Sequence, residues 1–285
     1  MKPTIPTLLA LLLLVPACGK PKTDTTNPGD TTASTTDGGD AGAVTDEPQP
    51  EPPPAQDPDP AELAQGVHQV LTGNYEEAIA TLEPIHTGMR EPSQMRASGL
   101  AGGWLAVAHA QIVFENAEAP AQYGLEMASK LQDPEVEAAA KLGRGALLLA
   151  QEDYDAAKQA LQAAAAASPA SAQGILAQVL HAQALIGTAF GSAESTELAK
   201  PEDLDAAKRS YEAALQAAGG TGAEADILKG RANEGLAAVA KYKRDKAALC
   251  AAAFAAVDQY KAAGASSFLL DGPSRMASDE KCKKK

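Results

Sequence analysis

An all-helical fold is predicted for this 285-residue chain on three observations. Alanine, the strongest helix former, is abundant from residue 61 onward, and its small side chain lets helices approach closely. The same region has long segments without proline, and the entire chain has only four phenylalanines. Runs of β-branched residues, which favour strands, are absent. The roughly 225 residues after position 60 are enough to bury a sizeable core.

The chain begins with the features of an export signal. Lys2 supplies positive charge, residues 8–15 form an unbroken apolar run, and small or apolar residues lead into Cys18. The apolar run is far shorter than the roughly 20 residues that a membrane-spanning helix needs. Residues 15–18 resemble the lipobox of bacterial lipoproteins, although Pro16 is not the usual residue at its position.

This resemblance implies that residues 1–17 are a signal peptide and that Cys18 becomes an acylated amino terminus. Two or more acyl chains anchor a protein stably, whereas one does not, so this modification would hold the chain on a membrane of the cell envelope. Gly19 rather than aspartate follows the cysteine, and by analogy with lipoprotein sorting in Gram-negative cells this favours the outer membrane over the inner one. The alternative is ordinary cleavage after Ala17, which leaves Cys18 as a free thiol.

A disordered linker is expected over residues 18–60, which are rich in Thr, Asp, Pro and Gly. Such a composition cannot bury enough apolar surface to offset the entropy of ordering. Seven prolines between residues 48 and 60 should make the end of the linker stiff and extended. Residues 20–60 carry nine acids against two lysines, a net charge of −7, and residues 61–285 carry another −7. This balance argues against nucleic acid and anionic lipid as direct partners.

Three later segments echo one another. Each segment begins with Asn or Asp, which a large residue follows directly. An alanine comes two or three positions after that residue, and a second large residue ends the segment. The segments are residues 74–82, 153–161 and 203–211. Gly66 and Gly145 stand nine residues before the tyrosine of the first two segments, and Pro169 closes the second. The pattern resembles the tetratricopeptide repeat, a helix-turn-helix unit of about 34 residues.

The resemblance implies an irregular solenoid of about five helical hairpins over residues 61–264, followed by a C-terminal tail over residues 265–285. The echoes lie 79 and 50 residues apart rather than at multiples of the repeat length, so helices or loops between them are lengthened. We expect an intervening pair of helices over roughly 93–114 and 118–130, with Trp104 in the core. A last pair is expected over roughly 223–242 and 245–263.

In this repeat family the first helices of successive pairs line a concave surface that binds segments of partner proteins. The resemblance therefore implies His68, Arg144, His181 and Arg231 as candidate groove residues. The sequence has no His-Glu-x-x-His, Gly-x-Ser-x-Gly or Cys-x-x-Cys motif, and its four histidines stand in separate segments. We therefore expect a protein that is not an enzyme and that uses no metal or cofactor.

Two cysteines remain if Cys18 is acylated. In an oxidising compartment, Cys250 and Cys282 can form a disulfide that pins the tail over the last hairpin. Such a bond would help to cover the apolar end of a helical array. The alternative is two unpaired thiols, because sequence does not show that the sulfurs meet.

Two functions are compatible with these features. The first is a membrane-anchored scaffold for protein–protein interaction in the cell envelope, with unidentified envelope proteins as partners. The alternative is a lipoprotein that binds a glycan, a peptide or a small solute in its groove. Sugar and solute sites need clustered aromatic side chains, and aromatic residues make up only 4% of the chain, so the scaffold is favoured.

Overall fold

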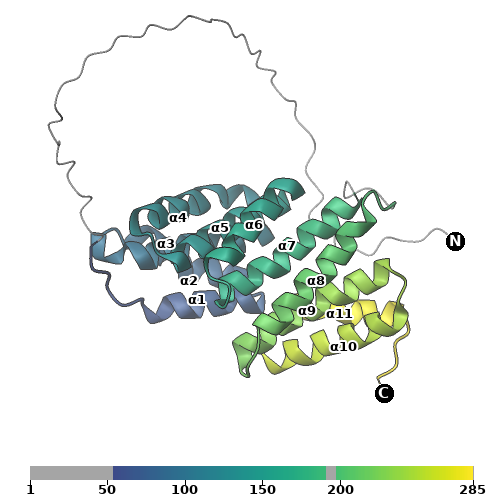
Figure 1. Cartoon of the computed structure of the whole chain (residues 1–285). Helices are drawn as coiled ribbons and strands as arrows, with labels where there is room; N and C mark the ends of the chain where they lie inside the picture. Colours follow the sequence, from purple (N-terminus) through teal and green to yellow (C-terminus); the bar gives the residue numbers. More distant parts are fainter. Residues whose placement is uncertain (1–53, 191–196, 285) are drawn as a thin grey trace, which may run out of the picture. The chain divides into compact units, whose positions relative to one another are not determined.

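Helices account for the regular structure of residues 54–190 and 197–284, the part of the chain that the computed structural model describes (Figure 1). Eleven α-helices and two short 3-10 turns lie in this part, which contains no strand, so the all-helical prediction is confirmed. The predicted signal peptide, Cys18 and the linker up to residue 53 lie outside the described residues. None of the described helices combines the length and the apolar character that crossing a membrane requires.

The helices pair in chain order into five hairpins, each helix packing on the next. The first helices of the hairpins are α1 (Ala61–Thr72), α3 (Met95–Ile112), α5 (Pro134–Ala150), α7 (Ala172–Phe190) and α9 (Ala223–Tyr242). The second helices are α2 (Tyr75–Gly88), α4 (Glu118–Leu131), α6 (Tyr154–Ala167), α8 (Pro201–Ala217) and α10 (Lys246–Ala262). The 3-10 turns Pro92–Gln94 and Phe114–Asn116 flank α3, and α11 (Ser267–Asp279) follows the last hairpin.

Local sequence signals explain where many of these helices begin and end. The side chains of Asp133, Asp153 and Asp245 accept hydrogen bonds from the first free backbone N–H groups of α5, α6 and α10. Pro201 starts α8, where its missing N–H has no cost. Gly73 ends α1 in the left-handed conformation, with φ 80°, which glycine adopts without strain.

Small residues set the distance between the first helices. A Cβ atom on Gly103 of α3 would come within 2.4 Å of the Ala139 backbone of α5, and one on Gly143 of α5 would come within 2.5 Å of the Gly103 carbonyl. Backbones can approach this closely only where side chains are missing. Trp104 is only 2% exposed, which confirms its predicted place in the core.

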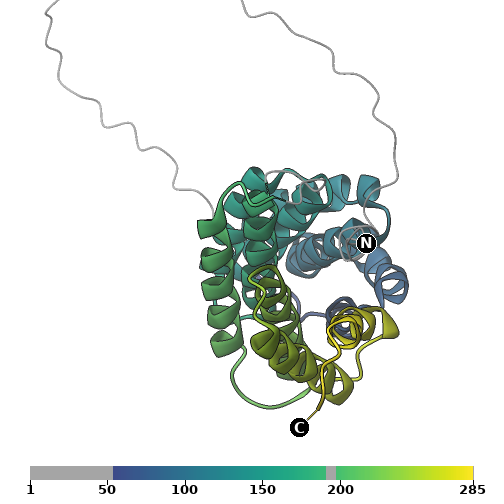
Figure 2. The same ribbon diagram turned by 90° about the vertical axis from the view of Figure 1, so that its right-hand side faces the viewer.

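The row of hairpins returns to its own beginning, because α9 and α11 both contact the first hairpin (Figure 2). The guanidinium of Arg231 in α9 donates hydrogen bonds to the Leu71 carbonyl, at 2.9 Å, and to the Tyr75 hydroxyl, at 3.1 Å. The Ser266 N–H donates to the Thr72 carbonyl at 2.9 Å. The Phe268 ring meets the Tyr75 ring edge-on, with centroids 5.6 Å apart. We call this set of interactions the closing contact.

The structure differs from the predicted domain limits at both ends of the helical unit. The predicted C-terminal tail contains α11, whose Leu269 and Met276 are buried. The last residues of the predicted linker are bound to the unit: Asp57 donates its N–H to the Ser93 carbonyl at 2.7 Å, and Asp59 forms an ion pair with Arg96. The folded unit therefore begins before α1 and continues almost to the end of the chain.

We expect Arg231→Gln to lower the free energy of unfolding by about 2 kcal/mol, because partly buried carbonyls of α1 lose a charged donor. Amide hydrogen exchange should also accelerate in α1. The matched control is Arg144→Gln, since Arg144 forms a partly exposed ion pair with Glu118. Its loss should cost no more than about 0.5 kcal/mol. Equal effects of the two substitutions in urea unfolding would contradict a closing role for Arg231.

Candidate functional site

The four predicted groove residues contact different elements and do not gather at one place. The His68 side chain is exposed on α1. Arg144 pairs with Glu118 at the start of α4. His181 lies 3.4 Å from the Ser210 hydroxyl of α8, and its pKa is lowered by burial and then by the charge of Lys158.

Arg231 is the clearest departure from the predicted groove. Its guanidinium is engaged by α1 in the closing contact, so it is not available at an open concave surface. One turn further along α9, the carboxylate of Glu234 accepts a 2.6 Å hydrogen bond from the Tyr260 hydroxyl. Burial raises the pKa of Glu234, while Tyr260 and Arg231 oppose the shift. These polar groups hold α9 against its neighbours.

His86 belongs to a second packed cluster, between α2 and α4. Its ring meets the Tyr123 ring edge-on at 4.8 Å, and the Arg90 guanidinium lies 4.6 Å from the centre of the same ring. Burial, followed by the charge of Arg90, lowers the pKa of His86. This edge-on contact joins two second helices, α2 and α4. Among the described residues, no group of three or more His, Cys, Asp or Glu side chains is placed to hold a metal ion.

A pocket of about 460 Å³ lies between α8 and α10, with α9 as its floor. We call it the α8–α10 groove, and it is lined by Lys208, Glu212, Asn233, Leu236, Val239, Ala240, Lys243, Asp245, Ala248, Ala251, Ala252 and Ala255. Its floor and one wall are mainly apolar, with small alanines on α10. Charged residues stand on the rim, where Lys208 pairs with Glu212 at 3.1 Å and Lys243 pairs with Asp205 of α8.

Sequence reasoning from the repeat family missed this groove, because it placed the binding surface on the first helices. One signal in the sequence could have indicated it. Ala248, Ala251, Ala252 and Ala255 recur at the three- and four-residue spacing of one helix face, and Ala248 and Ala251 are exposed. A row of small side chains that no larger side chain covers leaves a depression on the surface of a helix.

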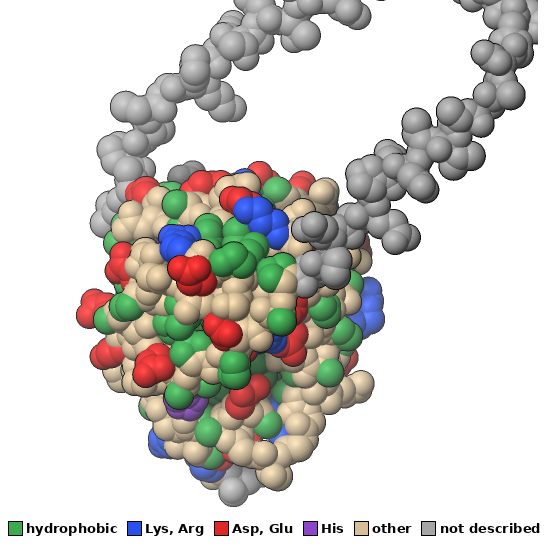
Figure 3. Space-filling model, turned by 90° about the vertical axis from the view of Figure 1, so that its left-hand side faces the viewer, with side chains coloured by type: hydrophobic (Ala, Val, Ile, Leu, Met, Phe, Trp, Pro, Cys, Tyr) green, Lys and Arg blue, Asp and Glu red, His purple; other side chains and the backbone are tan. Residues whose placement is uncertain are grey.

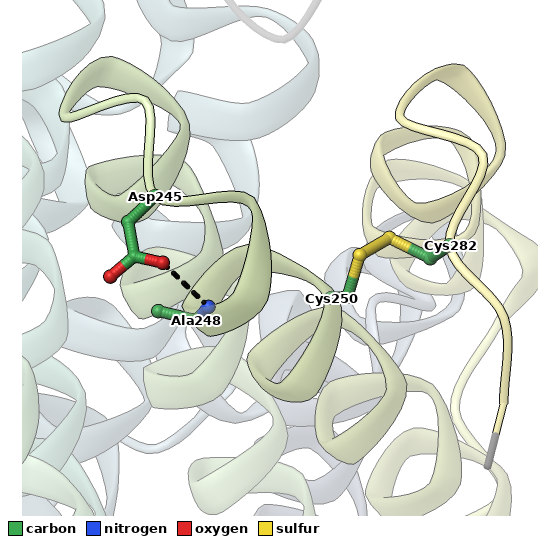
Figure 4. Close-up of a disulfide and its surroundings, with 4 residues drawn as sticks. All are labelled: Asp245, Ala248, Cys250 and Cys282. Carbon is green, nitrogen blue, oxygen red and sulfur yellow. Dashed lines mark hydrogen bonds between the residues drawn. A yellow bond between two sulfur atoms is a disulfide. The ribbon is translucent and has the colours of Figure 1, made fainter.

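Cys250 and Cys282 are bonded to each other in the structure, with their Cα atoms 5.5 Å apart (Figure 4). Cys250 lies in the first turns of α10 and Cys282 just after α11. The Cys282 N–H also donates to the Ala277 carbonyl at 2.9 Å. The bond holds the end of the chain beside the start of α10, close to the helix cap that Asp245 makes with the Ala248 N–H.

Acidic side chains are spread over much of the face shown in Figure 3, with fewer basic ones and with apolar side chains towards its middle. This picture agrees with the formal net charge of −13 for the whole chain. An acidic face disfavours contact with nucleic acid there, because phosphates would be repelled.

No family model, curated protein or solved structure matches the chain. What it binds is therefore inferred from its own residues. The α8–α10 groove combines an apolar floor with a charged rim, as the binding surfaces for helical segments of proteins commonly do.

Proposed function

We propose that this chain is a membrane-anchored, non-enzymatic scaffold that binds other proteins of the bacterial cell envelope. In this proposal, acylated Cys18 anchors the chain, at the outer membrane rather than the inner one, and residues 18–53 link the anchor to the helical unit. The helical unit is an irregular solenoid similar to tetratricopeptide repeats. Its binding surface is the α8–α10 groove and not the concave surface predicted from the family.

The α8–α10 groove is the observation that supports this function best. Its volume of about 460 Å³ is enough for several side chains of a partner, and none of its lining residues is aromatic. Sites for sugars and small solutes rely on aromatic side chains for much of their contact area. The composition of the groove therefore favours a segment of a protein over a glycan or a solute.

The shape of the groove suits a partner helix. Alanines on α10 let a second backbone approach closely, and the half-buried Leu236 of α9 offers apolar area to a residue on the partner. Each buried methylene contributes roughly 0.8 kcal/mol before the cost of association is subtracted, so the partner needs several anchoring side chains. The closing contact keeps α9 in place beneath the partner.

Photo-crosslinking in cells tests the binding surface. A photoreactive residue at Ala251, which is exposed in the groove, should capture a defined envelope protein, whereas the same residue at Ala262 should not. Both positions are exposed alanines of α10, and only Ala251 lines the groove. With the captured protein purified, Leu236→Glu should weaken its binding at least about tenfold, because a charge enters the apolar floor. Equal capture at both positions, or unchanged affinity, would refute the groove.

Cell fractionation tests the anchor. The natural chain should be found with the membranes and take up a radiolabelled fatty acid. Cys18→Ser should lose the label and move to the soluble periplasmic fraction, because no acyl chain is left to hold it. Cys282→Ser serves as the control, since it breaks the disulfide with Cys250 and leaves the lipobox intact. Membrane association that survives Cys18→Ser would show that the anchor lies elsewhere.

A further inference from the structure

Seven cations lie around the α9–α10 turn and along the tail that follows α11, on a chain that is acidic as a whole. We call this cluster the basic end; it consists of Lys241, Lys243, Arg244 and Lys246 around the turn from α9 to α10, and Lys281, Lys283 and Lys284 after α11. All of them except Lys241 are exposed. Five carboxylates lie among them, on Asp205, Asp245, Asp258, Asp279 and Glu280. The basic end therefore has a net charge of +2, against −13 for the whole chain.

The disulfide brings the start of the tail to the first turns of α10, because it joins Cys282 to Cys250 (Figure 4). Further along the tail, Lys284 donates to both carboxylate oxygens of Asp258, near the other end of α10, at 2.8 and 2.9 Å. Glu280 lines the same small pocket as Lys241. Cations from two distant stretches of sequence thus form one surface.

Most of this positive charge is unpaired. Lys243 pairs with Asp205, and Lys284 pairs with Asp258. Within the described residues, no carboxylate lies within ion-pair distance of the other five: Lys241, Arg244, Lys246, Lys281 and Lys283. These side chains are free to meet an anionic group from outside the unit.

Three of the unpaired cations surround a recess. A pocket of about 190 Å³ is lined by Ala240, Lys241, Arg244, Lys246, Leu249 and Glu280. Its apolar walls and converging cations suit a single acidic side chain, with Glu280 as the one acidic residue in the lining. The pocket shares Ala240 with the α8–α10 groove, so the two lie on either side of the same turn.

Arg244 occupies a strained backbone position at this turn. Its φ of 59° lies in the left-handed region, where glycine would be less strained by roughly 1 kcal/mol. Lys281 is placed in the same way, with φ 52°. Gln132 and Glu152 have the same conformation just after α4 and α5, so it belongs to the ends of helices in this fold and is not specific to the basic end.

We propose that the basic end recognises acidic side chains on the protein segment that occupies the α8–α10 groove. This inference rests on the proposed function and specifies the chemistry of the partner. The segment has an apolar helical face for the groove and a cluster of Asp or Glu residues at the end that lies beside the α9–α10 turn. A flat anionic membrane is a poorer match, because it would repel the acidic remainder of the unit and could not enter the recess.

Selection from a displayed library of peptides about 16 residues long, which span roughly 24 Å as a helix, tests the inference on the intact chain. Selected peptides should carry apolar residues at helical spacing and acids at one end. Replacing those acids by amides should weaken binding about tenfold at low salt, as expected for a few rim charges. A triple variant carries Lys241→Gln, Arg244→Gln and Lys246→Gln. Its affinity for the acidic peptide should fall by the same factor, and its affinity for the amide peptide should not change.

Arg244→Gly separates binding from folding. This substitution should leave the melting temperature unchanged or raise it, because backbone strain is relieved. It should still lower the affinity for the acidic peptide about threefold. The inference would be overturned if the selected peptides lacked acids, or if they bound the natural chain and the triple variant with equal affinity. The α8–α10 groove would still be supported as the binding surface. Failure to select any peptide sensitive to Leu236→Glu would overturn both. Phosphatidylglycerol vesicles that bind the natural chain but not the triple variant, with no peptide preference, would overturn the inference in favour of a lipid surface.

Discussion

The hydrogen bonds between Arg231 and the end of α1 join the two ends of the helical unit. The last carbonyls of any helix lack partners within that helix, and that of Leu71 finds one in a guanidinium from α9, 160 residues further along the chain. The Val70 carbonyl accepts from the same guanidinium and also from the Gly73 N–H. A charged donor in a partly buried place is costly to remove, because the carbonyls would then lose both this donor and access to water. The contact therefore holds a row of hairpins in a closed arrangement.

Closure determines which surfaces are left for binding. A row of helical hairpins with open ends exposes apolar faces that must be covered. Here the first and last hairpins cover each other, and α11 adds Leu269 against Gly73 at the join. Arg231 is used for this purpose and not for an open concave surface. The α8–α10 groove is a depression that remains available, between the second helices of the last two hairpins.

Much of the fold was predictable because the signals are local. Alanine content and the repeated pattern that begins with Asn or Asp predicted the hairpins, and the last pair was expected within one residue of its observed limits, Ala223–Tyr242 and Lys246–Ala262. The helix after it was missed because Gly272 and Pro273 interrupt its sequence.

The closing contact was missed for a different reason: a hydrogen bond between Arg231 and backbone carbonyls leaves no pattern in the sequence. The same applies to the α8–α10 groove, which depends on what the neighbouring helices leave uncovered. The lipid on Cys18 remains a prediction.

Photo-crosslinking within one molecule tests the closing contact most directly. Phe268 is 51% exposed and meets the Tyr75 ring, so benzoylphenylalanine can replace it with little disturbance. Irradiation of the purified chain at low concentration should join residue 268 to the peptide that contains Tyr75, and Arg231→Gln should reduce the yield. A crosslink only to neighbouring residues of α10 and α11, with none to the first hairpin, would show that the row of hairpins is open in solution.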